Sequence, residues 1–478
     1  MTSASSAARD ASAGHGDVVD TLVVGAGLSG LACAHTLARA GADVRVLEAS
    51  SIAGGVVGTV EYGRYHFESG PNTVQASSAE FRTLADELGL TPRLVVSSSR
   101  AKVRHLWHRG RLHALPRSPL GIFTTPLLSW RAKRTLATEF FRRFRPAGEH
   151  DDPDLRRFFT ERLGAEATEL LAGAFVRGVY AAELDELGTR SAFPKLWDGC
   201  VRAGGIVRWL RASRGAPRPT LPGPRCSPTD LLSFEDGLEE LPTALAHSLG
   251  ARLELSNAAL ELARDPAGWR VQRQRGAVLR ARRVVLALPA PAAARLLARL
   301  PETNAVAGVL AGITHARVTL AHLGFAQEGP LGPALGFGFL VPPGGGSSAP
   351  RMLGTICASN IFAHHAPPQH IAVTSFYASG SIADIGERDF ADFAAADFAR
   401  AVGLRNTPQR TATHVTHWTD VIPRYASGHR DHIAAAEREL AGCAPGLVLA
   451  GSYTGGVSVE QVITRGRDVA RAILAEVS

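Results

Sequence analysis

Cysteine is scarce in this sequence. The chain has 478 residues and only five cysteines, with no C-x-x-C pair among them. This pattern excludes a disulfide-stabilised secreted fold and offers no zinc-finger spacing. We therefore expect a reducing, cytoplasmic environment and no metal site. The cysteines are Cys33, Cys200, Cys226, Cys357 and Cys443.

Long apolar runs are also missing. The two most apolar stretches, residues 284–300 and 306–325, are interrupted by proline, arginine or histidine. A membrane-spanning helix needs about 20 consecutive, mostly apolar residues, so we expect none. A chain of this length with 45% hydrophobic and 20% charged residues is typical of several globular domains.

Basic charge is concentrated in one segment. Residues 100–145 contain twelve arginines and lysines but one acid, Glu139, whereas the whole chain has a net charge of +8. Most such segments are solvated helix surfaces. This one also contains Phe123 and Trp130, and apolar side chains beside a polybasic stretch suit an anionic bilayer. We therefore expect peripheral membrane association, and no nucleic acid as a partner because no base-reading motif is present.

A glycine-rich motif near the N-terminus predicts a dinucleotide site. Residues 18–24 are typical of a strand, 28–40 of a helix and 43–47 of a second strand. Between the first two, Gly25 allows a tight turn, Gly27 a close approach of the pyrophosphate and Gly30 close helix–strand packing. Glu48 follows the second strand, where a carboxylate accepts the ribose hydroxyls in such sites.

The rest of the chain favours FAD over a nicotinamide cofactor. A second G-x-G-x-x-G turn is missing, which makes dioxygen the default electron acceptor. Residues 451–457 form a glycine-rich turn before a predicted helix from about Ser458, which offers a second helix N-terminus to the cofactor. No cysteine stands in that segment, so we expect non-covalent binding.

From about Val18 onward the chain resembles the protoporphyrinogen oxidase family of the flavin amine oxidase superfamily. The motifs of the middle of the chain are the specific ones, because related amine oxidases do not share them. Departures from the family pattern occur at residues 182–184, 236–237 and 460–461. The similar motifs are Gly25–Gly30, Glu48, Gly54–Thr59, Gly70–Thr73, Phe175–Ala181, Phe193–Trp197, Phe234–Leu238, Gly336–Pro342, Leu353–Thr355, Trp418, Ile422–Tyr425, Gly428-His429 and Gly456–Val459.

The resemblance implies a fold of three parts, which combines α/β and α+β architecture. These are a discontinuous Rossmann-like FAD-binding domain, a mixed-sheet substrate-binding domain and a helical membrane-facing domain. The implied boundaries are a disordered tail at 1–17, the FAD-binding domain at 18–92, 227–292 and 441–478, the substrate-binding domain at 93–118 and 293–440, and the helical membrane-associating domain at 119–226.

The resemblance also implies the site residues. Arg104 matches the arginine that pairs with a substrate propionate, and Gly178 a backbone approach point. Phe337, Leu340, Ile356 and Cys357 resemble the apolar walls around the macrocycle, and no catalytic side chain is named. The implied cofactor-binding residues are Gly25, Gly27, Leu28, Ser29, Gly30, Glu48, Ala49, Gly54, Gly55, Gly70, Pro71, Asn72, Leu260, Trp418, Gly456 and Val457.

The function implied is oxygen-dependent oxidation of protoporphyrinogen IX to protoporphyrin IX. Three hydride transfers to flavin, each followed by reoxidation with release of hydrogen peroxide, complete the six-electron reaction. The enzyme is expected in the cytoplasm at the membrane surface. The sequence does not decide whether it forms a homodimer. The alternatives are coproporphyrinogen III oxidation, a flavin amine oxidase and a non-catalytic FAD-binding scaffold. Against an amine oxidase, whose site typically holds a lysine, the only lysines here are Lys102, Lys133 and Lys195.

Overall fold

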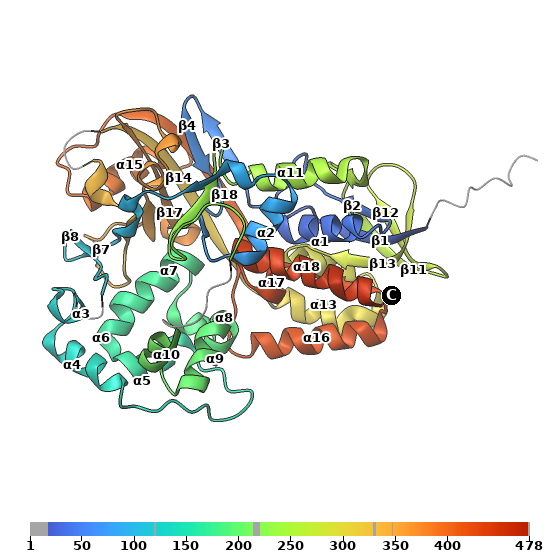
Figure 1. The fold of residues 1–478 in the computed structure, drawn as a ribbon, viewed down its shortest axis with the longest axis horizontal. Coiled ribbons are helices and arrows are strands. Elements are labelled where there is room, and N and C mark those ends of the chain that lie inside the picture. The colour runs from blue at the N-terminus through green and yellow to red at the C-terminus, as the bar shows by residue number, and fades with distance from the viewer. Residues whose placement is uncertain (1–17, 119–120, 214–219, 328–330, 347, 477–478) are drawn as a thin grey trace, which may run out of the picture.

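The computed structural model describes residues 18–118, 121–213, 220–327, 331–346 and 348–476. The predicted N-terminal tail lies outside these residues. Figure 1 shows one β-sheet at the right, a second sheet at the upper left and a group of helices below the second sheet.

The first sheet is mostly parallel and is covered by helices on both faces. Its strands follow the order β10 (Leu253–Glu254), β2 (Val44–Leu47), β1 (Val18–Val24), β13 (Leu279–Leu286), β12 (Gly268–Arg273) and β11 (Ala259–Asp265), and β19 (Leu447–Leu449) pairs with β13. The pairs β10–β2, β2–β1, β1–β13 and β13–β19 are parallel. This is the Rossmann-like sheet that the sequence predicts.

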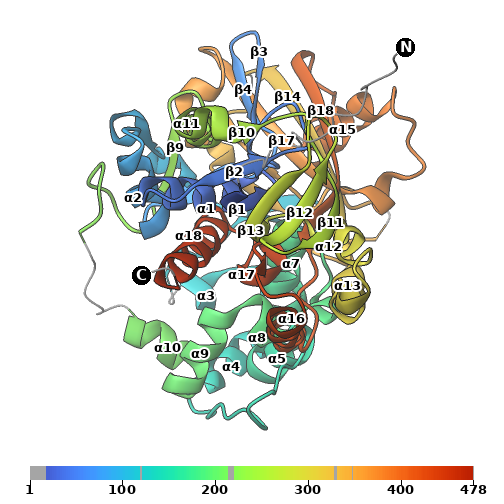
Figure 2. The ribbon, with the colours of Figure 1, turned by 90° about the vertical axis from the view of Figure 1, so that its right-hand side faces the viewer.

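Alternate residues of the central strands explain the two covered faces. Val23 and Val285 pack with α1 (Leu28–Arg39) and α18 (Val459–Ala475), which lie side by side in Figure 2. On the other face, Leu22 and Val284 pack with α12 (Ala290–Leu297), α13 (Asn304–Ala311) and α16 (His429–Cys443). Parallel strands buried on both sides require such continuous apolar sequence.

The chain between α11 (Glu240–Leu249) and β12 forms two separate strands, β10 and β11. Ser256 between them has a left-handed backbone with φ of 50°. The chain turns here because the amides of Ser256 and Asn257 donate to the carbonyl oxygens of Ser50 and Glu48, at 2.8 and 2.7 Å. These two hydrogen bonds hold the segment between β10 and β11 beside the end of β2.

The second sheet is mixed. Its order is β18 (Arg410–Pro423), β14 (His315–Ala326), β17 (His370–Ala378), β16 (Gly354–Ile356), β15 (Gly338–Leu340), β7 (His105–His108) and β8 (Arg111–Ala114). β15 and β7 run parallel, and the other neighbours are antiparallel. Helix α15 (Phe390–Ala401) covers one face of this sheet. The predicted mixed sheet is therefore confirmed.

Shorter elements connect the two sheets. They are the hairpin β3 (Thr59–Tyr62) and β4 (Tyr65–Glu68), and the small sheet β5 (Val74–Gln75), β9 (Leu231–Phe234) and β6 (Leu94–Val96). Tyr65 and Phe67 of β4 pack against Ala372 of β17 and Ala412 of β18. Helices α2 (Ala79–Glu87) and α11 (Glu240–Leu249) lie with α1 in the core of the first sheet.

Residues 121–212 form a separate helical unit. It comprises α3 (Gly121–Thr124), α4 (Trp130–Glu139), α5 (Leu155–Leu163), α6 (Ala165–Ala167), the π-helical η3 (Thr168–Gly173), α7 (Ala174–Tyr180), α8 (Thr189–Ala192), α9 (Pro194–Ala203) and α10 (Ile206–Ala212). Among the described residues, no helix is both long and apolar enough to cross a bilayer. The domain boundaries and a membrane-facing role for this unit stay predictions.

Candidate active site

The glycine-rich turn is held by close packing on two sides. A Cβ on Gly25, whose φ is 105°, would lie 2.5 Å from the carbonyl oxygen of Ala287, and one on Gly30 would lie 2.0 Å from that of Gly25. A Cβ on Gly27, in contrast, would meet no atom within 4 Å. The open side of the turn is therefore at Gly27, at the N-terminus of α1, where free amides attract phosphate.

A cavity of about 310 Å³ adjoins this turn. Glu48 at its edge accepts hydrogen bonds from the amides of Ala26 (2.7 Å) and Ser50 (2.8 Å). Its carboxylate is thus held at the carboxyl end of β2, where a ribose is expected. The predicted residues Gly25, Glu48, Ala49 and Leu260 all line this cavity.

Two loops extend the site away from this cavity. The amide of Gly54 donates to the carbonyl oxygen of Ala26 at 2.8 Å, and a Cβ on Gly55 would lie 3.2 Å from the Cα of Gly27. In the loop after β4, the Asn72 side chain donates to the Gly70 carbonyl at 3.0 Å, while its own Oδ1 is buried without a partner. An unpaired buried acceptor suits a bound ligand with a donor group.

The C-terminal motif closes the same side. The Trp418 indole donates to the carbonyl oxygen of Ser69 at 2.7 Å. Residues 452–455, expected to be part of a turn, form the short helix α17, and Gly456 follows with φ of 120°. Ser458 and Gln461 then cap α18 reciprocally. Through its hydrogen bond to Ser69, Trp418 on β18 contacts the loop that contains Gly70, Pro71 and Asn72.

The predicted substrate residues lie on or directly beside β7, β15, β16 and α7. The Arg104 guanidinium lies 5.0 Å from the ring centroid of Phe337. Phe337 accepts a hydrogen bond from the amide of Cys357 at 2.8 Å, and Ile356 pairs with Gly338 in the sheet. Arg104, Phe337 and the pair Ile356–Cys357 come from three separate segments and therefore form one corner of the site.

Gly178 lies against Leu340. A Cβ on Gly178 would be 2.3 Å from Cδ2 of Leu340, so any larger residue would displace that side chain. This contact joins the helical unit to the second sheet. Phe337, Leu340 and Ile356 are all partly exposed, so their apolar side chains are accessible to a ligand.

Cys357 differs from its neighbours. Its side chain is 1% exposed, and burial raises the pKa of its thiol to about 12. A buried, protonated thiol is not a nucleophile. Cys357 therefore supports the wall from behind.

Arg104 is accessible to solvent, yet surrounding protein atoms lower the pKa of its guanidinium by desolvation. It stays charged at neutral pH, because arginine does not deprotonate in proteins. Within the described residues no carboxylate lies in ion-pair range of Arg104. It is therefore free to bind a carboxylate of a ligand.

Sequence reasoning missed two residues of the nucleotide cavity. Arg295 on α12 and Arg299 in the turn that follows this helix line it together with Glu48 and Leu260. Neither has an ion-pair partner within the part of the chain that the structure describes. Their spacing of four residues is visible in the sequence, but only the packing of α12 on the sheet brings them to the cavity.

The residues present fit FAD. The open face of Gly27, the carboxylate of Glu48 and the unpaired Oδ1 of Asn72 offer the contacts that a dinucleotide needs. The sequence profile described as flavin containing amine oxidoreductase matches residues 28–474. The assignment of individual site residues stays a prediction.

Comparisons with characterised proteins agree. The protoporphyrinogen oxidase of Homo sapiens is 30% identical over 95% of this chain and 98% of its own length, and the chloroplastic enzyme of Nicotiana tabacum is 27% identical over 95% and 85%. The crystal structure of a putative protoporphyrinogen oxidase from Exiguobacterium sp. 255-15 has a TM-score of 0.79 at 24% identity, covering 96% of this chain and 99% of that one. The chain is therefore an FAD-dependent oxidoreductase that belongs to the flavin containing amine oxidoreductase family and, within it, to the protoporphyrinogen oxidases.

Proposed function

We propose that this protein oxidises protoporphyrinogen IX to protoporphyrin IX with dioxygen as the acceptor. The relatives named above support this reaction, and the unpaired Arg104 beside a partly exposed apolar wall is the observation that carries it. One porphyrinogen and three dioxygen molecules would give one porphyrin and three molecules of hydrogen peroxide. Bound FAD supplies an acceptor of two electrons at a time.

The chain itself contributes orientation. Arg104 would bind a propionate, and Phe337, Leu340 and Ile356 would hold the macrocycle and exclude water from it. Of the predicted slot residues, Arg104 alone carries a charge at neutral pH, since the thiol of Cys357 stays protonated. We therefore assign no general base, and catalysis rests on positioning the substrate against the cofactor.

The charge of the slot favours a dicarboxylate over a tetracarboxylate porphyrinogen. Arg177, next to Gly178, is neutralised by Glu183 at 3.1 Å. Lys102, near Arg104, pairs with Asp230 at 3.2 Å. With both neighbouring cations paired, Arg104 is left to bind one propionate.

The test compares porphyrin fluorescence from the two porphyrinogens under air, with peroxide measured in parallel. Replacing Arg104 by alanine is expected to raise KM for protoporphyrinogen about tenfold or more, because charged hydrogen bonds contribute about 1.5–3 kcal/mol, while R104K restores part of the affinity. The matched control is R111A, an exposed arginine on the neighbouring strand β8. Failure of the wild-type protein on both substrates, or equal effects of R104A and R111A, would overturn the proposal.

We further propose that the helical unit docks peripherally on an anionic membrane. Trp130 (69% exposed) and Arg134 of α4, and Phe141 (79% exposed) just beyond the end of this helix, face solvent. Aromatic side chains flanking basic ones suit the headgroup region of a bilayer. A cytoplasmic enzyme at the membrane surface would meet its hydrophobic substrate there.

Co-sedimentation tests this second proposal. The protein is expected to bind vesicles that contain phosphatidylglycerol more tightly than pure phosphatidylcholine vesicles, and raising the salt concentration should weaken that binding. The double variant W130S/F141S should lose binding. Equal binding to both vesicle types, unaffected by salt, would contradict it.

A further inference from the structure

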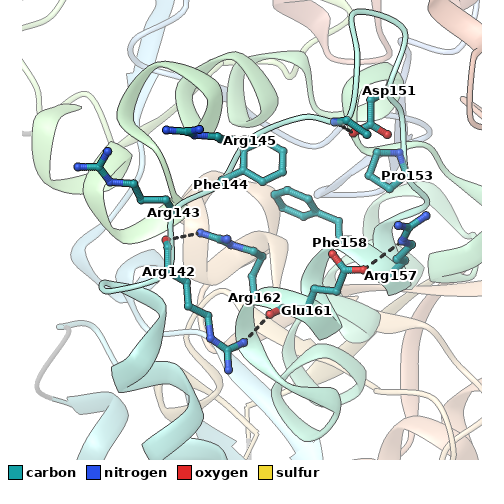
Figure 3. Close-up of a pocket in the computed structure, with 11 residues that line it drawn as sticks. Arg142, Arg143, Phe144, Arg145, Asp151, Pro153, Arg157, Phe158, Glu161 and Arg162 are labelled. Carbon is teal, nitrogen blue, oxygen red and sulfur yellow. Dashed lines mark hydrogen bonds and ion pairs between the residues drawn. The ribbon is translucent and has the colours of Figure 1, made fainter.

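A second cavity, remote from the nucleotide cavity, opens in the helical unit. Its volume is about 550 Å³, and it lies between α5 and residues 142–153, the connection that follows α4. Figure 3 shows the side chains that surround it, with Phe144 and Phe158 facing the open space. No residue of the predicted substrate or cofactor sites lines it.

Arginine dominates the lining. The five arginines are Arg142, Arg143, Arg145, Arg157 and Arg162. Two of them are neutralised: Arg157 pairs with Glu161 at 3.0 Å, and Arg162 with the buried Glu139 at 2.9 Å.

The other three have no carboxylate within ion-pair range among the described residues. Arg142 donates to the Glu161 carbonyl oxygen at 2.8 Å, which leaves its charge in place. Asp151 is the remaining acid of the lining, and its carboxylate accepts the amide of Ala147 at 2.7 Å. Three unpaired guanidinium groups against one carboxylate give the cavity an excess of positive charge.

A buried donor in the wall also lacks a partner. The Arg162 side chain is 8% exposed, and its guanidinium lies 5.6 Å from the Phe144 ring centroid. Its Nη2 donates to Glu139 and to the carbonyl oxygen of Arg142, but its Nε is buried without an acceptor. An unsatisfied buried N–H indicates a missing acceptor.

The surroundings of the cavity are apolar and exposed. Phe140 and Phe141 precede the cavity residues directly, and Leu210 on the adjacent α10 is 50% exposed. The Arg208 guanidinium lies 5.5 Å from the Phe140 ring. A ligand in the cavity would therefore have a charged group among arginines and an apolar part beside phenylalanines.

We infer that this cavity binds the phosphate of an anionic phospholipid headgroup, with the acyl chains leaving over Phe140 and Phe141. Arginine is suited to phosphate because its planar fork donates two hydrogen bonds at once. The inference rests on the membrane docking proposed above and gives it a specific ligand. Inorganic phosphate could contact the same arginines, but it has no acyl chains to contact Phe140 and Phe141.

Calorimetric titration of the FAD-loaded protein with dihexanoyl phosphatidylglycerol, kept below its micelle concentration, tests the inference without a membrane. The wild-type protein is expected to bind one molecule saturably. The double variant R143Q/R145Q should bind at least tenfold more weakly. The matched control R131Q/R134Q removes the same charge from the exposed face of α4 and should stay within twofold of wild type.

The outcomes distinguish binding of a lipid headgroup in the cavity from docking of the protein on a membrane surface. Equal weakening by both double variants means a diffuse charge effect and overturns the site. Inorganic phosphate that binds as tightly as the lipid overturns the lipid assignment. Weaker vesicle binding in W130S, which lies outside the cavity and the proposed acyl path, with titration of the soluble lipid unchanged, supports the site independently of docking. All variants should retain porphyrinogen oxidation in detergent, so a failure of the proposed reaction would appear in the wild-type protein instead.

Discussion

At the scale of single residues, two glycines of one motif have different tasks. A Cβ at Gly30 would overlap the carbonyl oxygen of Gly25, whereas one at Gly27 would point into open space. We expect G30A to lower the thermal stability of the apoprotein, since the strand and α1 must separate. We expect G27A to leave that stability nearly unchanged but to weaken FAD binding by about 1–3 kcal/mol, the usual cost of overpacking.

Thermal unfolding of the apoprotein and fluorescence titration with FAD measure these two effects separately. A G27A variant that unfolds as early as G30A, yet binds FAD normally, would show that the open side of the turn does not face the pyrophosphate.

Arg295 and Arg299 offer a second prediction at this scale. Both line the nucleotide cavity and are exposed, so they should attract the two phosphates of FAD through solvent. We expect R295Q/R299Q to raise the Kd for FAD about two- to tenfold at low salt, since each exposed charge contributes roughly 0.2–1 kcal/mol. The difference should shrink at high salt.

The control is R270Q, an exposed arginine on β12 of the same sheet. If R270Q weakens FAD binding as much as the double variant does, overall charge and not the cavity determines the effect.

At the scale of elements, one carboxylate organises the helical unit. Glu139, the single acid of the basic segment, is fully buried at the end of α4. It accepts hydrogen bonds from Arg162 of α5 and from the amides of Ile206 and Val207 at the start of α10. Because it joins three helices, E139A should lower the free energy of unfolding by about 3–5 kcal/mol.

The control is E161A, which removes an exposed ion pair on α5 and should cost only about 0.3–0.5 kcal/mol. Urea unfolding of both variants compares the two values. Similar small losses would mean that the buried pair does not hold the helices together.

The sequence predicted those strands and helices whose own residues show a clear apolar or glycine pattern. β1 and α1 form where the apolar run and the glycines indicate, because both faces of that strand are buried. β18 was not predicted, since most of its residues are polar, half-buried or exposed, without regular alternation, along an edge strand that pairs only with β14. Likewise, the contact of Gly178 with Leu340 depends on how the helical unit packs on the second sheet, which no local pattern encodes.

At the scale of the whole molecule, buried neutral histidines predict that the folded protein loses stability in acid. His322 hydrogen-bonds to Thr374 and Thr416, and His365 is 1% exposed with both ring nitrogens unpaired. Burial lowers the pKa of each to about 3, helped by His414 for His322 and by His364 and His66 for His365. Below the ordinary pKa of 6.5 the unfolded chain therefore binds more protons, and stability falls as the pH decreases.

Glu68 acts in the opposite direction. Burial raises its pKa to about 8, so its contribution increases as the pH falls from 8 toward 4.5. We expect H365L to reduce the loss of stability between pH 6.5 and 4.5 by up to about 1.4 kcal/mol per pH unit. Urea unfolding at several pH values gives the slope, and H247Q, on the exposed side of α11, is the control. An unchanged slope in H365L would contradict this assignment.

The pairing of α1 with α18 also has a temporal consequence. Residues 28–39 leave the ribosome long before residues 459–475, yet the two helices pack against each other beside the glycine-rich turn. A nascent chain cannot complete this pocket until translation reaches α18. The flavin site is therefore assembled only after the C-terminal helix has been synthesised.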